Sequence, residues 1–510
     1  METTTAETFW TPLNQQSGYD SQLAPVEGLD AADAERIDAT VHSVRAAFAP
    51  PVDLETRLDR LDRLESMLRR WEAPLVEALG QDLGKSTTEA WTTELGTVFG
   101  EIHHLRRLLP QWMALSKVPG SATLAPSRGW VDHQPLGTVL IIAPWNYPVQ
   151  LVLSPLAGAL AAGNTAVVKP SEVTPHVAQV LTEALQDSLA DCVGVVTGAV
   201  PETTRVLQHR FDHIFYTGNA TVGRVVMRAA AEYLTPVTLE LGGKSPVWVD
   251  DTVDLKVAAQ RIAWGKFLNA GQTCVAPDYV MGPPQVLQRL ETLLAAAVTS
   301  LYGADPARSD SYGRIVSRRH LDKLATTLSE VATEDMIFGG GTDAEQLYVA
   351  PTVVRQAPDG PLMQEEIFGP VLPLVEAADH HQAIQYINAR EKPLALYVFS
   401  QDDAVRSEFR ALTSSGGMCV GAPVIHLAHP HLPFGGVGES GVGNYHGAYS
   451  LQTFSHERAV LDKPLNPDTL KVVYPPYTAI KAKGAKIAMG LPSPTAAVRK
   501  LFGGGSTRPR

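Results

Sequence analysis

The sequence predicts an α/β protein with two doubly wound domains. At about 100–200 residues per domain, a chain of 510 residues has room for two or three domains with cores of their own. Short apolar runs alternate with helical patterns along two long stretches, which is typical of parallel sheets covered by helices. With 45% hydrophobic and 19% charged residues, the composition is that of a folded chain and excludes a disordered one.

The N-terminal part of the chain predicts an arm followed by helices. Residues 1–28 are polar and irregular, and their first ten are not the basic and then apolar start of a signal peptide. Apolar residues then recur at three- and four-residue spacing from Leu54 to Trp71, where Pro74 ends the pattern, and again from Trp91 to Trp112. We expect two amphipathic helices there, with their apolar faces in the core.

The first sheet is predicted from residue 139 onward. Val139–Ala143 and Thr165–Lys169 have the pattern of buried strands, and a helix opened by Ser154 and Pro155 is expected between them. The remaining strands of the two sheets are expected at Val193–Thr197, His213–Tyr216, Ser245–Val249, Ala350–Val354, Leu372–Val375 and Leu396–Phe399.

Charge and cysteine content limit the class of protein. A net charge of −12 argues against a nucleic-acid-binding body. The charge is uneven, because residues 463–510 carry nine basic residues and one acid, so that this basic tail is +8 and the remainder is −20. The only cysteines are Cys192, Cys274 and Cys419, which predict no disulfide framework and favour a reducing cytoplasm.

Cys274 is the best candidate for a nucleophile. It follows Asn269-Ala270-Gly271-Gln272-Thr273, in which small and polar residues and a glycine allow close access. A single cysteine is more often a small buried hydrophobic residue, and Cys192 and Cys419 keep that interpretation.

Glu240 is the candidate general base. It ends an apolar strand pattern and precedes Gly242 and Gly243, so its carboxylate is expected to be partly desolvated, with a pKa raised enough to accept a proton near neutral pH. An ion pair with Lys244 on a surface turn explains the same segment equally well.

Three further segments follow predicted strands. Gly218 and Gly223 open a helix after the strand at 213–216 and offer backbone N–H groups to a phosphate. Asn146 lies in a rigid loop after the first strand, where its amide can donate to an oxyanion. Lys169 and Glu172 end the next strand at the carboxyl edge of the sheet and are placed to hold ribose hydroxyls.

Together these segments resemble the aldehyde dehydrogenase superfamily, from roughly residue 30 to residue 460. Glu365–Pro370 and the glycine-rich stretch Pro433–Gly447 are most similar to the class-three branch, which oxidises fatty and aromatic aldehydes. The resemblance implies NAD(P)-dependent oxidation of an aldehyde to a carboxylic acid through a thiohemiacetal and a thioester on Cys274.

The resemblance also implies the roles of individual residues. Asn146 and the Cys274 N–H match the oxyanion hole, and Glu240 matches the base that activates water. The residues that match the cofactor site are Lys169, Glu172, Gly218, Gly223, Glu366 and Phe368. The residues that match aromatic walls of the substrate tunnel are Trp264 and Phe434. The segment Cys419–Pro423 lacks the Asn-Asp pair that the family usually has there, so the pocket floor is expected to differ.

Cofactor and domain bounds follow from the same resemblance. Glu172 favours NAD by bonding a 2′-hydroxyl, with NADP as the alternative. We expect an NAD(P)-binding domain at 29–126 and 135–240, a catalytic domain at 241–430, and an oligomerisation element at 127–134 and 445–462 that joins a homodimer or homotetramer. The remaining segments are the arm at 1–28 and the basic tail at 463–510.

Two alternative functions stay open. A cysteine-dependent esterase would use Cys274 but would leave Lys169 and Glu172 unexplained, and a non-catalytic protein could keep the same fold.

His426, His429 and His431 are close in sequence, but their spacing matches no zinc template, and we expect no metal. The basic tail has no apolar run long enough to span a membrane. It is either a solvated extension or a weak peripheral contact with an anionic membrane.

Overall fold

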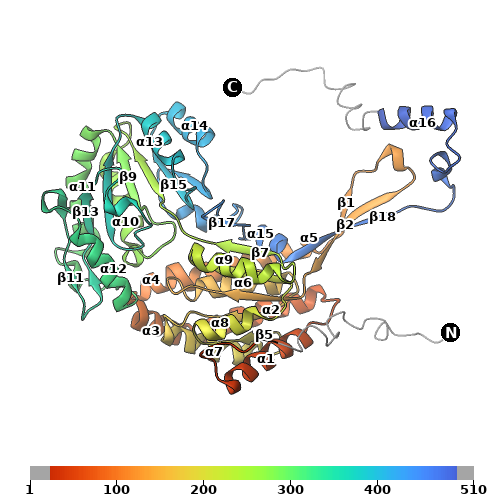
Figure 1. Ribbon diagram of the computed structural model, residues 1–510, viewed down its shortest axis with the longest axis horizontal. Helices are drawn as coiled ribbons and strands as arrows, with labels where there is room; N and C mark the ends of the chain where they lie inside the picture. Colours follow the sequence, from red (N-terminus) through yellow and green to blue (C-terminus); the bar gives the residue numbers. More distant parts are fainter. Residues whose placement is uncertain (1–22, 491–510) are drawn as a thin grey trace. The chain divides into compact units, whose positions relative to one another are not determined.

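The computed structural model describes residues 23–490 and divides the chain into two compact units (Figure 1). Among these residues, unit 1 comprises 23–109 and 135–454, and unit 2 comprises 110–134 and 455–490. Most of the arm expected at 1–28, and residues 491–510 of the basic tail, lie outside the described residues.

The first sheet of unit 1 has six strands in the order β17-β7-β6-β3-β4-β5. All neighbours are parallel except β17, which pairs antiparallel with β7. This order places the first strand, β3, in the middle and winds outward in both directions, as a doubly wound sheet does. The strands are β3 (Thr138–Ile142), β4 (Thr165–Lys169), β5 (Val193–Val195), β6 (His213–Thr217), β7 (Val237–Glu240) and β17 (Gly441–Val442).

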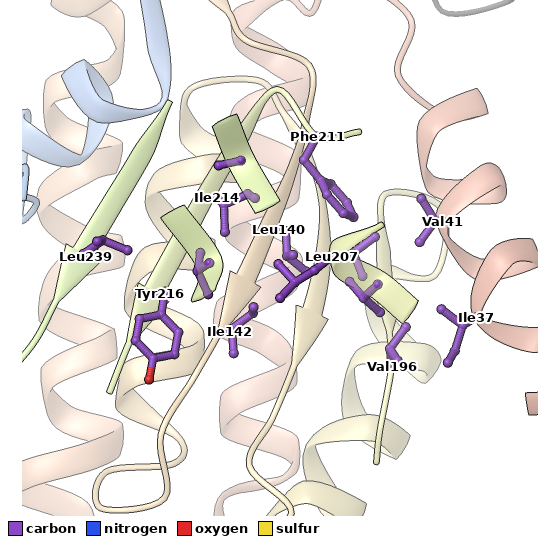
Figure 2. Close-up of a cluster of buried hydrophobic side chains, with 14 of the residues drawn as sticks. Ile37, Val41, Leu140, Ile142, Val196, Leu207, Phe211, Ile214, Tyr216 and Leu239 are labelled. Atoms are coloured by element: carbon purple, nitrogen blue, oxygen red, sulfur yellow. The ribbon is translucent and has the colours of Figure 1, made fainter. Parts of the chain in front are cut away.

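Helices cover this sheet with apolar faces that the sequence pattern predicted. In α2 (Leu54–Arg70), Asp53 caps the first turn by accepting the Thr56 N–H, and Leu61, Leu64 and Leu68 are fully buried. The core next to β3 and β6 includes Ile37 and Val41 of α1 (Ala31–Ala46), as Figure 2 shows. The other helices of this part are α3 (Glu72–Leu83), α4 (Thr87–Ala90), α5 (Gly96–Trp112), α6 (Gln150–Ala161), α7 (Pro175–Leu189), α8 (Val200–Leu207) and α9 (Ala220–Ala231).

Two helical details differ from the expectations. The helix between β3 and β4 begins at Gln150 and not at Ser154, because the buried Glu94 carboxylate accepts the N–H groups of Val149 and Gln150 and so caps the helix earlier. The pattern from Trp91 to Trp112 is not one regular helix, since Trp91–Leu95 forms a π-helical turn ahead of α5.

The second sheet of unit 1 has seven strands in the order β10-β13-β14-β9-β8-β15-β16. Only β10 is antiparallel to its neighbour, so this part is doubly wound as well. The fold class predicted from the sequence, two doubly wound α/β sheets, is therefore confirmed. The strands are β8 (Pro246–Val249), β9 (Tyr279–Gly282), β10 (Met336–Phe338), β13 (Thr352–Arg355), β14 (Val371–Glu376), β15 (Ala395–Phe399) and β16 (Gly417–Val420).

Helices pack around this second sheet (Figure 1). They bury a core that includes Trp248, Met281 and Phe409. A two-stranded ribbon lies between β10 and β13 in the sequence and consists of β11 (Thr342–Asp343) and β12 (Tyr348–Val349). The helices are α10 (Leu255–Phe267), α11 (Pro284–Tyr302), α12 (Arg318–Ser329), α13 (His380–Asn388) and α14 (Asp403–Leu412), and the short helix α15 (Ala448–Thr453) packs against α6.

Unit 2 is a three-stranded sheet followed by a short helix. Its strand order is β1-β2-β18, formed by β1 (Ser116–Val118), β2 (Arg128–Pro135) and β18 (Ser455–Asp462). Arg458 of β18 pairs with Asp132 of β2 at 2.6 Å. The helix α16 (Ala479–Gly490) lies in the basic tail. Within residues 23–490, no helix is both long and apolar enough to cross a membrane.

Candidate active site

Cys274 lies in a loop between α10 and β9 whose backbone is strained. Asn269 and Ala270 both adopt the left-handed region, with φ of 51°, and Gly271 follows with φ of 76°. Such angles are unfavourable for residues with a Cβ and persist only where surrounding contacts hold them. The Glu89 carboxylate accepts the Asn269 N–H at 2.8 Å. Gly271 is required because a Cβ there would lie 2.3 Å from the Gly369 carbonyl oxygen.

The Cys274 thiol keeps partial access to solvent but has an acidic environment. Burial among protein atoms, together with the nearby carboxyls of Glu366 and Glu240, raises the pKa of the thiol to about 12. The thiol is therefore protonated at neutral pH in the chain alone. Cys192 is fully buried and Cys419 is partly exposed on β16, and burial raises the pKa of both.

Glu240 ends β7, and its carboxyl group is buried without a partner. The residue is only 2% exposed, and within the described residues neither Oε1 nor Oε2 has a hydrogen-bond partner. Desolvation raises the pKa of this carboxyl well above its usual range. Lys244 does not pair with Glu240, because its Nζ bonds Asp278 Oδ2 at 2.5 Å and donates to the carbonyl oxygens of Leu362 and Glu365.

Asn146 lies in the loop after β3 and contacts the loop that carries Cys274. Its Nδ2 donates to the Gln272 carbonyl oxygen at 3.0 Å, two residues before the cysteine. The next residue, Tyr147, shares a hydrogen bond of 2.6 Å with the Thr273 hydroxyl. The structure thus joins two segments that are 126 residues apart in the chain.

The segments expected to bind a cofactor lie at the carboxyl ends of β4 and β6. Lys169 Nζ pairs with Glu172 Oε2 at 2.6 Å, beside a pocket of about 420 Å³. Gly218 follows β6, and a Cβ there would lie 2.2 Å from the Tyr216 hydroxyl. Gly223 lies in the first turn of α9, which Asn219 caps by accepting the Val222 N–H. The residues that line the pocket are Pro170, Ser171, Glu172, Pro175, Ala178, Gln179, Thr182, Glu183, Thr197 and Gly198.

Glu366 and Phe368 approach the site from the segment before β14. The Glu366 carboxyl packs against Gly242, where a Cβ would lie 2.1 Å from Oε2, and burial together with Asp278 raises its pKa to about 8. Phe368 has a left-handed φ of 48°, and its ring meets the edge of Trp145 at 5.3 Å.

The two candidate wall residues have different surroundings. Phe434 is buried in an aromatic group with Tyr445 at 5.8 Å and His426 at 6.3 Å between ring centroids. Trp264 is partly exposed near the end of α10 and makes no ring contact with the other candidates among residues 23–490. Burial, with a further effect of the nearby Glu240 and Cys274, raises the pKa of the Tyr445 hydroxyl, so the ring that Phe434 contacts lies near both groups.

Comparison with known proteins decides the family. The profile of the aldehyde dehydrogenase family matches residues 20–460, which is most of the chain. The chain belongs to the aldehyde dehydrogenase family. It is 47% identical to aldehyde dehydrogenase family 3 member B1 of Bos taurus, over 88% of this chain and 97% of that protein. It is 44% identical to the dimeric NADP-preferring aldehyde dehydrogenase of Canis lupus familiaris, over 87% of this chain and 98% of that protein.

Solved structures of aldehyde dehydrogenases agree with this assignment. The substrate-bound state of Staphylococcus aureus AldH superimposes with a TM-score of 0.87 at 42% identity and covers 89% of this chain and 99% of that one. The resemblance to the class-three branch is confirmed, and the chain is an NAD(P)-dependent oxidoreductase that converts aldehydes to carboxylic acids.

The residues of this aldehyde dehydrogenase fit a dinucleotide cofactor. The pocket of about 420 Å³ beside Glu172 has room for a nucleoside. Gly218 lies just before α9, and the N-terminus of such a helix offers backbone N–H groups to a pyrophosphate.

The three histidines that are close in sequence, His426, His429 and His431, have different ring neighbours. His429 and His431 have ring centroids 5.9 Å apart, and His431 meets His104 at 4.8 Å, whereas His426 packs beside Phe434. In the part of the chain that the structure describes, the group close enough to share a metal ion lies elsewhere, on α13 and α14. It consists of His380, His381 and Glu408, where one Glu408 oxygen bonds both imidazoles at 2.9 and 3.1 Å.

Sequence reasoning missed several residues that shape the site. Tyr445 lies within the glycine-rich stretch that carried the resemblance, so its position was visible although its role was not. Asp278 is the partner of Lys244, and the motif around Lys244 gives no sign of it because the two residues are 34 positions apart. Lys85 lies between α3 and α4, outside both apolar patterns, and Glu94 is a polar residue within the second pattern, so neither residue stands out in the sequence.

Proposed function

We propose that Cys274 is the nucleophile of the aldehyde oxidation and Glu240 its general base. The observation that carries this proposal is that Cys274, a partly exposed residue, has near its thiol the buried Glu240 carboxyl, which has no hydrogen-bond partner among the described residues. As the Cys274 sulfur bonds the aldehyde carbon, the π bond of the carbonyl opens, and the thiol proton, which a pKa of about 12 keeps in place beforehand, passes to the aldehyde oxygen. The product of this step is a thiohemiacetal.

Asn146 is proposed to stabilise the charge that develops on the aldehyde oxygen. One hydrogen of its Nδ2 is used by the Gln272 carbonyl, and the second remains to donate to an oxyanion. The backbone N–H of Cys274 is the second proposed donor. Donors fixed in this way favour the transition state because they need no reorganisation when the charge appears.

Lys169, Glu172, Gly218, Gly223, Glu366 and Phe368 are proposed to hold the cofactor. Lys169 and Glu172 would bind the adenosine ribose, and Gly218 and Gly223 would allow the backbone to approach the pyrophosphate. Glu366 would bind the nicotinamide ribose, and Phe368 would contact the nicotinamide ring. When bound, NAD(P)⁺ supplies the acceptor for the hydride that leaves the thiohemiacetal carbon.

Glu240 is proposed to release the product. A thioester on Cys274 is hydrolysed by water, and the Glu240 carboxylate takes a proton from that water as it attacks. A carboxyl with a raised pKa is suited to this task, since its ionised form is a stronger base than an ordinary carboxylate. The carboxylic acid then leaves, and the Cys274 thiol is restored.

We propose medium- and long-chain aliphatic and aromatic aldehydes as the substrates, with Trp264 and Phe434 as apolar walls of the substrate tunnel. The test compares kcat/KM for propanal, octanal and benzaldehyde by the absorbance of the reduced cofactor. Octanal and benzaldehyde are expected to exceed propanal, because each buried CH₂ adds about 0.8 kcal/mol of binding. Ester hydrolysis without any reduction of NAD(P)⁺ would instead support the cysteine esterase.

Glu172 is expected to disfavour a 2′-phosphate. Glu172→Gln should raise the ratio of kcat/KM for NADP over NAD by about fivefold, the factor that corresponds to a repulsion of ~1 kcal/mol between partly solvated charges. Initial rates with both cofactors measure this ratio. Glu183→Gln, in the wall of the same pocket, is the matched control. An equal change in both variants would show that the charge of the pocket, and not Glu172, sets the preference.

We further propose a homodimer or homotetramer joined through residues 127–134 and 445–462. Support comes from unit 2, where β18 is the edge strand of a three-stranded sheet and can pair with a second copy. The name of the canine relative includes the word dimeric. Light scattering on the full chain tests this proposal, and a monomer at micromolar concentration would contradict it.

A cytoplasmic location with weak contact at a membrane surface is proposed for the chain. In α16, Ile480 and Met489 are more than 80% exposed, and Lys481 and Lys483 lie between them in sequence. Basic residues near an anionic surface contribute about 1 kcal/mol each. Co-sedimentation with phosphatidylserine vesicles should weaken when residues 463–510 are deleted, and unchanged co-sedimentation would remove the proposal.

A further inference from the structure

A buried ion pair lies behind the loop that carries Asn146. Lys85 Nζ donates to Glu94 Oε1 at 2.5 Å, and both side chains have no exposed surface. Ion pairs of this kind are poor sources of stability, because desolvation of the two charges offsets their attraction. The proposed chemistry uses neither residue, so the pair requires another explanation.

The cation of the pair holds the main chain of Asn146. Lys85 Nζ donates to the Asn146 carbonyl oxygen at 3.0 Å and lies 4.0 Å from the centre of the Tyr147 ring. The same carbonyl oxygen accepts the Asn269 Nδ2 at 2.8 Å, from the strained segment before Cys274. The backbone of Asn146 is therefore fixed from two sides.

The carboxylate of the pair holds the chain just after this loop. Glu94 Oε2 accepts the N–H of Val149 at 3.1 Å and of Gln150 at 2.8 Å, where α6 begins. Glu94 lies in the π-helical turn Trp91–Leu95. Turns of this type occur often at functional sites.

These contacts determine where the Asn146 amide can lie. With its carbonyl held by Lys85 and the following turn held by Glu94, the side chain meets the Gln272 carbonyl oxygen at 3.0 Å. We propose that Lys85 and Glu94 are positioning residues that keep the Asn146 amide where the oxyanion forms. This inference rests on the role proposed above for Asn146.

The first test removes both charges together. Lys85→Met/Glu94→Gln removes both charges of the pair, so its thermal midpoint should fall less than that of Lys85→Met alone, in which Glu94 stays buried without its cation. Buried Glu89 loses the attraction of Lys85 in both variants, so this loss cancels in the comparison. Hydrolysis of p-nitrophenyl acetate, measured without cofactor, should nevertheless fall about 10- to 100-fold, as expected when a catalytic group is displaced. If the double variant hydrolysed p-nitrophenyl acetate as fast as the unchanged chain, the proposal would be overturned.

Matched controls separate positioning from general damage. Arg355→Met/Glu291→Gln removes a surface pair of 2.6 Å and should leave the rate unchanged. Alkylation of Cys274 by iodoacetamide needs no oxyanion hole, so its rate should be the same in the double variant and the unchanged chain. A large loss of alkylation would mean that the cysteine loop itself has moved, and it would contradict action through Asn146.

The decisive test is a double-mutant cycle with Asn146→Ala. If Lys85 and Glu94 act through the amide, their replacement should change the ester hydrolysis rate by a factor near one in the Asn146→Ala background. The full 10- to 100-fold loss in that background would overturn the proposal. An Asn146→Ala rate equal to that of the unchanged chain would overturn the role of Asn146 itself. A chain inactive toward both esters and aldehydes would overturn the proposed function, so these failures remain distinguishable.

Discussion

Cys274→Ala is expected to reduce aldehyde oxidation below detection, a loss on the order of 10⁶-fold as in other enzymes that lose a covalent nucleophile. The thiol forms the bond on which both later steps depend, and Cys192 is fully buried and cannot replace it. Ester hydrolysis should vanish as well. Initial rates of cofactor reduction and of p-nitrophenol release measure the two losses.

The matched control for this variant is Cys419→Ala. Cys419 is a second partly exposed thiol, on β16, and its removal should leave both rates unchanged. The affinity for NAD, measured by calorimetry, should stay near normal in Cys274→Ala, because Cys274 is not one of the residues that line the pocket beside Glu172. Oxidation that survives in Cys274→Ala but disappears in Cys419→Ala would show that Cys419, and not Cys274, is the nucleophile.

Glu240→Gln is expected to slow deacylation by about 10²- to 10⁴-fold, the usual contribution of a general base. The amide has the same shape, and the carboxyl has no hydrogen bond to lose within the described residues, so only proton transfer is removed. A first burst of reduced cofactor should persist while steady-state turnover falls. Stopped-flow absorbance distinguishes the two phases. Full turnover in this variant would exclude Glu240 and make Glu366 the alternative base.

The pH dependence follows from the direction of the Glu240 shift. Burial raises the pKa of this carboxyl, and only its ionised form accepts a proton from water. Deacylation should therefore increase as the pH rises through that raised pKa, and Glu240→Gln should lose this dependence. The folded state also binds the proton more tightly than the unfolded state, so ionisation destabilises the fold as pH rises. At alkaline pH, the thermal midpoint of Glu240→Gln should therefore equal or exceed that of the unchanged chain.

The fold was largely predictable from local patterns because its two sheets are built of short buried runs separated by helical ones. Thr165–Lys169 is predicted and observed with identical bounds. The start of α6 at Gln150 was not predictable, because its cap is Glu94, 55 residues earlier in the chain. The residues next to Gln150 give no sign that a carboxylate from another helical segment caps α6.

The sequence predicts which residues belong to the candidate site but not the contacts that they make with one another. The segment around Glu240 left an ion pair with Lys244 open, and the structure shows Lys244 bound to Asp278 instead. Small polar neighbours indicated access to Cys274 but not the burial that, together with an acidic environment, raises the pKa of its thiol to about 12. That environment comes from Glu240 and Glu366, which reach the thiol from distant parts of the chain. Long-range contacts of this kind carry no local pattern.

The central claim is a covalent acyl intermediate on Cys274 that Glu240 clears. The most direct measurement is mass spectrometry of the Glu240→Gln variant, quenched after mixing with NAD and octanal and then digested. We predict an octanoyl thioester on the peptide that contains Cys274, which the unchanged chain accumulates far less. Reduced cofactor formed without an adduct on that peptide, or with an adduct on another residue, would contradict the account.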